Sequence, residues 1–217
     1  MFDFNFIGWN ITTFFSVILV LLTIIQAISL NLQIKNIKKM QSGKSASLFM
    51  FTSLIFFFIL VLIYGIKIKN PVLIFNGILL FPMHIPVALW LLKFKKMLTI
   101  EKIGTSLFII ASIASLLVSK NSLGIIYTII SLMTAIPLLH QVYTLWKEKS
   151  PGVVEIKMLI AFMLSALTWL IYSVVIKEFP LIFAGFLFFI IRITSIILWL
   201  RYSRINKIKS PIKKEVL

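Results

Sequence analysis

The chain has 217 residues, of which 60% are hydrophobic and 13% are charged, and its mean hydropathy is +1.08. A water-soluble domain of this length has no interior able to hide that much apolar surface, so a lipid bilayer is the expected surrounding. The formal net charge is +16 and the chain has no cysteine, which excludes disulfides and thiol catalysis.

Seven apolar runs, each long enough to cross a bilayer as a helix, follow one another with short loops between them. In chain order they are Ile7–Gln33, Leu48–Ile66, Pro71–Leu92, Ile103–Ser119, Leu123–Leu145, Met158–Ile176 and Pro180–Leu200. The first run is interpreted as a retained span, because it lacks the basic start and the cleavage site of a signal peptide. We predict an all-α polytopic membrane protein with seven transmembrane helices, of which the fourth is the shortest.

The basic residues gather in the segments that follow spans one, three, five and seven. These segments hold Lys35, Lys38, Lys39, Lys44, Lys93, Lys95, Lys96, Lys102, Lys147, Lys149, Lys157, Arg201, Arg204, Lys207, Lys209, Lys213 and Lys214. The other side holds Lys67, Lys69, Lys120 and Lys177. Basic clusters between apolar runs are typical of cytoplasmic loops, not of a nucleic-acid-binding surface. We expect a cell-membrane protein (plasma or inner membrane) with its N-terminus outside, its C-terminus cytoplasmic and no nucleic-acid partner.

The chain also resembles itself at an offset of 108 residues, without a gap from 26 to 95. The polar and turn-forming matches carry the argument, because two membrane segments share Leu and Ile by chance. They pair Gln33 with Gln141, Lys39 with Lys147, Ser42 with Ser150, Tyr64 with Tyr172 and Gly77 with Gly185. We predict a three-helix repeat at 1–96, a linker helix at 97–120 and a second three-helix repeat with a basic tail at 121–217. The linker would make the two bundles parallel (3+1+3), with a shared site between them near mid-membrane.

At this point the residues resemble the SWEET and SemiSWEET sugar facilitators of the PQ-loop superfamily, over almost the whole chain. In that family a Pro-Gln pair ends the first helix of each repeat, and a basic stretch with Lys-Ser follows. Here the pairs are Leu32-Gln33 and His140-Gln141, so the glutamine is kept and the proline is lost both times.

The resemblance also implies where a substrate would bind. The family's second helix often carries Trp-x-x-Tyr-Gly, and its third helix often carries an Asn that hydrogen-bonds the sugar. At these positions the first repeat has Val61 and Asn76, and the second has Trp169 and Ala184, which together form the predicted substrate site. An aromatic face for C–H groups and an amide for hydroxyls suit a sugar. Helix bridging by Asn76, and a place for Trp169 in the interfacial aromatic belt, remain the alternatives.

Two ionisable side chains lie inside spans at equivalent positions, His84 in the third and Arg192 in the seventh. Arg192 either snorkels to the inner headgroups or faces His84 across the inner half of a pathway. Gln33 and Gln141, near the cytoplasmic ends, are either wetted there or cap helix carbonyls. We assign these four residues to an inner vestibule or gate. Pro137 is the expected hinge, because proline removes a backbone hydrogen bond inside span five.

The six acidic residues all fall in loops or tails on this interpretation. Proton-coupled carriers of the superfamily usually use a membrane-embedded acid, so we expect passive facilitation unless His84 carries a proton. The expected function is uniport of a small solute, with a sugar favoured, by alternating access. Two alternatives remain open: an amino-acid or zwitterion carrier, and a KDEL-receptor-like receptor for a peptide carboxylate. In the carrier Arg192 would bind the carboxylate, and in the receptor Arg192 and His84 would bind it.

Nothing in the chain points to catalysis. No nucleophile–base set, metal cluster or phosphate-binding loop stands out in the sequence. We therefore expect no enzyme activity, no catalytic residue, no metal and no cofactor. A homo-oligomer remains open.

Overall fold

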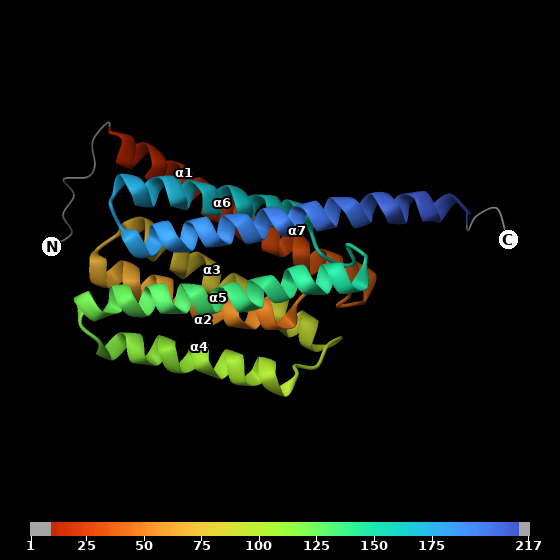
Figure 1. Ribbon diagram of the computed structural model, residues 1–217, viewed down its shortest axis with the longest axis horizontal. Helices are drawn as coiled ribbons and strands as arrows, with labels where there is room; N and C mark the ends of the chain where they lie inside the picture. The colour runs from red at the N-terminus through yellow and green to blue at the C-terminus, as the bar shows by residue number, and fades with distance from the viewer. Residues whose placement is uncertain (1–9, 213–217) are drawn as a thin grey trace.

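The computed structural model describes residues 10–212, except the side chains of residues 120–121 and 207–212. Over this range the chain forms seven helices joined by short connections (Figure 1). They are α1 (Ile11–Met40), α2 (Leu48–Ile68), α3 (Pro71–Leu92), α4 (Thr99–Leu117), α5 (Lys120–Glu148), α6 (Ile156–Val175) and α7 (Phe179–Ile212). All seven are long and apolar enough to cross a membrane. The predicted all-α, seven-span class is confirmed.

The predicted spans and the helices differ mainly at their ends. Hydropathy ended the first and last spans where lysine and arginine begin, yet α1 continues to Met40 and α7 to Ile212. Lysine, arginine and glutamine are good helix formers, so a helix can leave the apolar layer without ending. In α4 the helix begins at Thr99, which places Glu101 in its first turn, and Glu148 is the last residue of α5. The prediction that every acid lies in a loop or tail is therefore wrong for these two residues. Residues 7–9 of the first predicted span lie outside the described range.

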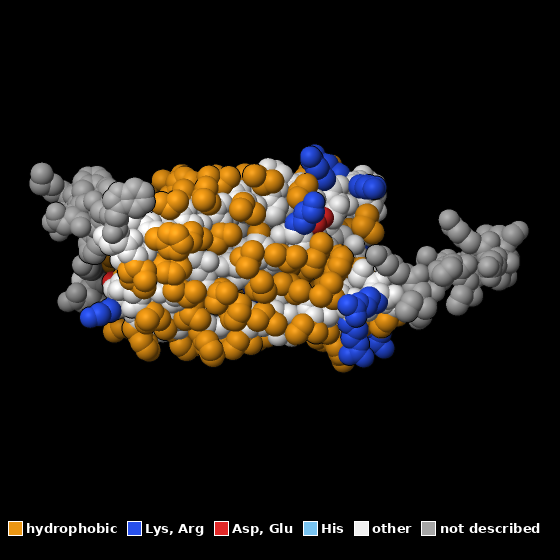
Figure 2. All heavy atoms as spheres, turned by 90° about the horizontal axis from the view of Figure 1, so that it is seen from above, with side chains coloured by type: hydrophobic (Ala, Val, Ile, Leu, Met, Phe, Trp, Pro, Cys, Tyr) orange, Lys and Arg blue, Asp and Glu red, His pale blue; other side chains and the backbone are white. Residues whose placement is uncertain are grey.

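The surface has the two zones of a membrane protein. Figure 2 shows hydrophobic side chains over the broad middle of one face and most of the visible Lys and Arg at one end. We call this end, where α1, α3, α5 and α7 finish, the basic end. The other end of the bundle is called the opposite end. Ile110 on α4 and Ile125 on α5 are examples of large apolar side chains that stay exposed. A bilayer would cover this apolar band.

The helices pack in two similar groups. In the first, α3 packs against both α1 and α2; in the second, α7 packs against both α5 and α6. Between the groups, α1 packs on α6 and α2 packs on α5, so each group offers its first and second helices to the other. The fourth helix packs mainly on α2, outside this arrangement (Figure 1).

Polar contacts fasten α4 at both of its ends. At the opposite end, the Lys67 ammonium donates hydrogen bonds to three backbone carbonyls at the C-terminal end of α4, where the helix dipole is negative. Near its middle, the Ser112 hydroxyl contacts the backbone carbonyl of Phe56 on α2, at 3.1 Å. At the basic end, a carboxylate oxygen of Glu101 lies 3.6 Å from Nε2 of His140 on α5.

Glycine lets α3 approach α2 closely. A Cβ built on Gly77 would lie 2.6 Å from the Leu62 Cβ and 2.8 Å from the Leu62 backbone nitrogen. At the equivalent place in the second group, a Cβ on Gly185 would lie 3.0 Å from the Leu170 backbone. Small residues at such crossings allow the backbone contacts that drive helix association in lipid.

Replacing Gly77 by alanine should therefore loosen the α2–α3 contact and lower the melting temperature of the detergent-purified protein. We expect a loss of ~1–3 kcal/mol, typical of overpacking a tight contact. Gly124→Ala is the matched control, because a Cβ there would meet only the Pro180 Cγ, at 3.7 Å. Equal melting temperatures for the two variants would contradict this reading of the contact.

Candidate functional site

A cavity of about 80 Å³ lies between the helices of the two groups. Its lining comes from α1, α2, α3, α5, α6 and α7. The lining residues are Gln26, Leu54, Phe57, Phe58, Val61, Leu73, Asn76, Tyr127, Leu138, Phe162, Ser165, Ala166, Trp169, Leu181, Ala184, Gly185, Phe188 and Arg192. A mostly apolar and aromatic wall with a few polar groups is the usual character of a small-molecule site.

All four residues of the predicted substrate site line this cavity. Val61 on α2 and Trp169 on α6 are 108 residues apart, as are Asn76 on α3 and Ala184 on α7. The structure therefore brings together side chains that the sequence could only pair by their spacing. Trp169 lies in the cavity wall, and its ring meets that of Tyr172 edge-on at 5.6 Å.

The Asn76 side chain is held in place from α1. Its Nδ2 donates to Thr23 Oγ1 at 3.0 Å, and that hydroxyl donates in turn to the Leu19 carbonyl at 2.7 Å. Asn76 is 3% exposed and still belongs to the cavity lining. It thus bridges two helices and presents an amide to the cavity, which combines the two roles considered for it.

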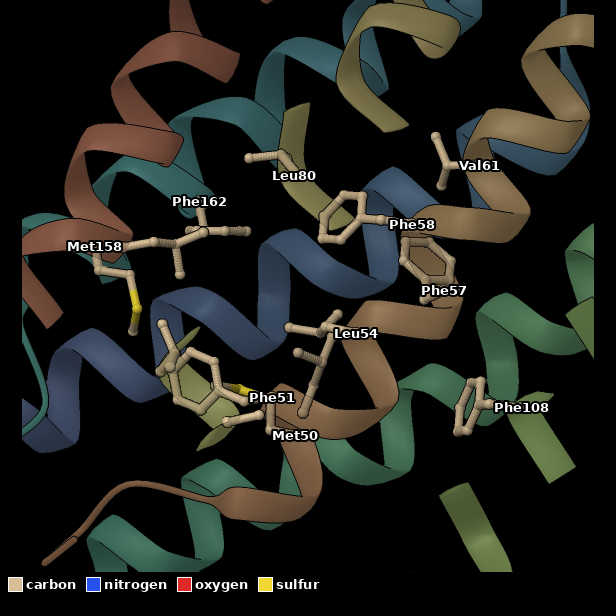
Figure 3. Packing of buried hydrophobic residues seen from close by; sticks show 14 of the residues in the cluster. Met50, Phe51, Leu54, Phe57, Phe58, Val61, Leu80, Phe108, Met158 and Phe162 are labelled. Carbon is tan, nitrogen blue, oxygen red and sulfur yellow. The ribbon is translucent and has the colours of Figure 1, made fainter. Parts of the chain in front are cut away.

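Aromatic rings make up much of the rest of the wall. Phe57 and Phe58 come from α2, and Phe162 comes from α6 (Figure 3). Near the opposite end, Tyr127 of α5 lies parallel to Tyr64 of α2, with 4.5 Å between ring centroids. Flat, rigid side chains from both groups thus surround the centre of the bundle, where the C–H faces of a solute would meet them.

Sequence reasoning missed Gln26, another amide in the wall. Gln26 lies on α1, is 3% exposed and lines the cavity. Its Oε1 is buried and has no hydrogen-bond partner within the described part of the chain. Its polarity inside a span was visible in the sequence, but its repeat equivalent is Thr134, so the repeat gave no second amide to draw attention to it.

Arg192 lines the cavity and does not snorkel to the surface. It is 4% exposed, and its Nη1 lies 3.7 Å from the Met50 sulfur. The guanidinium carbon lies 5.0 Å from the centroid of the Phe162 ring, in a cation–π contact. Neither ion pair found between residues 10 and 206 involves Arg192. The structure thus supports the cavity-facing alternative for this residue.

His84 is buried beside the cavity but does not line it. Its Nδ1 donates to the Leu80 carbonyl at 2.7 Å. Its ring packs among Phe58 and Phe162, with centroids 5.0 and 5.9 Å away. Phe162 contacts both His84 and Arg192, and no hydrogen bond joins these two residues in the described part of the chain.

At the basic end, two glutamines join the helix groups by an exchange of hydrogen bonds. Gln33 on α1 donates to the Val153 carbonyl at 2.9 Å and accepts from the Glu155 N–H at 2.8 Å. Gln141 on α5 does the same to the loop before α2, donating to the Ser45 carbonyl and accepting from the Ser47 N–H, both at 2.7 Å. Both amides are buried, so the alternative of wetting by headgroups is wrong.

These four hydrogen bonds are related by the 108-residue offset. Residues 153 and 155 are the equivalents of 45 and 47, just as Gln141 is the equivalent of Gln33. Each glutamine satisfies one carbonyl and one N–H of the loop that leads into the second helix of the other group. Buried backbone groups need such partners inside a membrane protein.

A second exchange lies at the opposite end, and sequence reasoning missed it. The Tyr64 hydroxyl donates to Glu178 at 3.1 Å, and the Asn70 amide donates to the Tyr172 hydroxyl at 3.2 Å. The tyrosines are equivalent at the 108-residue offset, and so are Asn70 and Glu178. The matching tyrosines were visible in the sequence, but their partners differ in type and lie in the other group.

His140, the residue before Gln141 in α5, also has a role in the basic end. His140 Nδ1 lies 2.8 Å from the Ser47 hydroxyl, while its Nε2 faces Glu101 of α4. A histidine here therefore connects α5 to α2 and α4, which a proline ring could not do.

Seven apolar helices, six of which line a cavity between the two groups, define an integral, multi-pass membrane protein. Residues 121–207, which hold α6 and most of α5 and α7, match a family described as sugar efflux transporters for intercellular exchange. This match supports the predicted resemblance to the SWEET and SemiSWEET family over residues 121–207. A comparison with curated proteins returned no match.

Loss of one glutamine should loosen the loop of the other group. Gln33→Ala leaves the Val153 carbonyl and the Glu155 N–H without their side-chain partner, which costs ~1–3 kcal/mol. Backbone hydrogen exchange should therefore speed up at 153–155, and Gln141→Ala should do the same at 45–47. Gln41→Ala is the control, because Gln41 is exposed and donates only to Lys38 of its own turn. If backbone hydrogen exchange at the distant loop stayed unchanged, the glutamine would not hold the loop of the other helix group.

Proposed function

We propose that the protein is a facilitative transporter of a small polyhydroxylated solute, a sugar in its simplest form, working by alternating access between two parallel three-helix units. The observation that carries the proposal is the central cavity, which is lined by Asn76 of the first unit and by Trp169 of the second. The match of residues 121–207 to a family of sugar efflux transporters supports the same function.

The proposed 3+1+3 organisation rests on contacts and spacing. The packing of α1 on α6 repeats as that of α5 on α2, and both ends of the bundle carry paired hydrogen bonds at the 108-residue offset. A twofold axis along the membrane normal would produce both features. The site then lies at the interface between units, where many carriers place it.

When the units move against each other, the contacts at the basic end and at the opposite end would break in turn. Breaking the tyrosine bonds would open the cavity to one side, and releasing the glutamines would open it to the other. Pro137, inside α5 and one turn before Gln141, removes a backbone hydrogen bond and is the proposed hinge. Its equivalent in α1 is Ser29, whose hydroxyl bonds back to the Gln26 carbonyl at 2.7 Å, a contact that also favours bending.

The proposed orientation places the basic end in the cytoplasm and the N-terminus outside, in the cell membrane. The distribution of lysine and arginine supports it. Lys38 and Lys93 lie over the Trp90 ring at 4.7 and 3.8 Å, an arrangement suited to the interface with lipid headgroups. Passive transport is favoured because the described cavity lining contains no carboxylate to carry a proton.

The proposal is tested in liposomes. Purified protein should equilibrate labelled glucose without a proton gradient, and Asn76→Ala should slow this uptake roughly tenfold, as expected for losing one well-placed hydrogen bond. Asn31→Ala is the control, since Asn31 lies exposed on α1. A rate in the Asn76→Ala variant equal to that of the control would remove Asn76 from the site.

The outer closure can be tested by labelling a single thiol. The chain has no cysteine, so Ala184→Cys puts the protein's one thiol in the cavity. Adding Tyr64→Phe removes the bond to Glu178 and should raise labelling by a membrane-impermeant reagent from the opposite end, by roughly tenfold for a bond to a charged group. Tyr143→Phe, at an exposed tyrosine near the basic end, should leave the rate unchanged. No increase with Tyr64→Phe would show that this bond does not close the cavity.

A further inference from the structure

The cavity lining contains one charged residue among the residues described, Arg192. A guanidinium loses its hydration when it is buried, and this is costly unless acceptors replace the water. Because Arg192 is only 4% exposed, these acceptors would have to come from the residues around it.

The protein supplies little to balance this charge. The Met50 thioether at 3.7 Å is a weak acceptor, and the Phe162 ring at 5.0 Å offers only its π face. The ion pairs in the described range, Lys95–Glu148 and His140–Glu101, belong to the basic end. Arg192 therefore holds a positive charge against the cavity with most of its five N–H donors free for another molecule.

The shape of the free group selects the ligand. A guanidinium presents parallel N–H donors that match the two oxygens of a carboxylate. The same wall presents the amides of Gln26 and Asn76 and the hydroxyl of Ser165, which suit hydroxyl groups, beside the flat face of Trp169. Resting on the transport function proposed above, we propose that the solute is a polyhydroxylated monocarboxylate, a sugar acid such as a hexuronate, whose carboxylate pairs with Arg192.

The lining residues also favour a sugar acid over two other classes of charged solute, amino acids and phosphate monoesters. A zwitterionic amino acid would bring an ammonium group into the cavity, and the lining residues include no carboxylate to receive it. A phosphate monoester would bring up to two negative charges against a single guanidinium. A singly charged acid is the solute whose charge the site neutralises.

Carrying a monoanion makes the transport electrogenic, whereas carrying a neutral hexose does not. At equilibrium a singly charged solute distributes tenfold across a membrane potential of about 59 mV. This gives a readout that depends on the charge carried and not on how well a variant folds.

The test uses the full-length protein in liposomes, with labelled glucuronate, glucose and alanine at equal concentration. Glucuronate uptake should exceed glucose uptake at least tenfold, and a potassium diffusion potential, positive inside, should accumulate glucuronate alone. Arg192→Gln and Arg192→Met should lower the glucuronate-to-glucose ratio at least tenfold, with Arg192→Lys between. The methionine variant keeps an apolar chain against Met50 and Phe162 if the glutamine variant folds poorly. Arg201→Gln, an exposed arginine on the same helix, should keep the ratio.

The outcomes separate the two proposals. Glucose uptake without glucuronate uptake would overturn the sugar-acid inference and leave the facilitator intact. Alanine uptake above both sugars would overturn it in favour of a zwitterion. No uptake of any of the three, by protein that melts normally, would overturn the transport function itself.

Discussion

The bundle depends on two glutamine side chains that each complete the backbone hydrogen bonding of the other helix group. Gln33 and Gln141 supply a donor and an acceptor to loops that would otherwise be buried with unpaired carbonyls and N–H groups. A contact made to backbone does not depend on the loop's side chains. It sets the relative register of α1 and α6, and of α5 and α2, and the position of the cavity follows from that register.

These backbone contacts are the same in both units, whereas the side chains that line the cavity differ between the units. Position 76 is an asparagine where its equivalent is Ala184, and position 169 is a tryptophan where its equivalent is Val61. Arg192 has a buried, aromatic-packed histidine as its counterpart. Paired structural contacts hold the two halves alike, so a change inside the cavity in one half need not disturb the fold of the other.

Much of the fold was predictable, because a bilayer admits few backbone arrangements and leaves a strong apolar signal for each helix. The sequence could predict those residues of the site, such as Trp169, that occupy equivalent positions in the two repeats. Spacing does not say which way a side chain points, so Arg192 had two possible places and Gln26 was not singled out. Partners such as Glu178 were hidden for another reason: they depend on how distant helices meet, which no local pattern records.

The attachment of α4 has a consequence for how the bundle could move in lipid. Lys67 and Ser112 tie this helix to α2, whereas its ion pair with α5 joins Glu101 to a partly exposed His140. This single contact, at 3.6 Å, is outnumbered by the hydrogen bonds that Lys67 and Ser112 make between α4 and α2, so it would yield before them. A body of four helices would then rock against a body of three. The lipids around the smaller body would have to rearrange more, which would make the transport rate sensitive to bilayer thickness and fluidity.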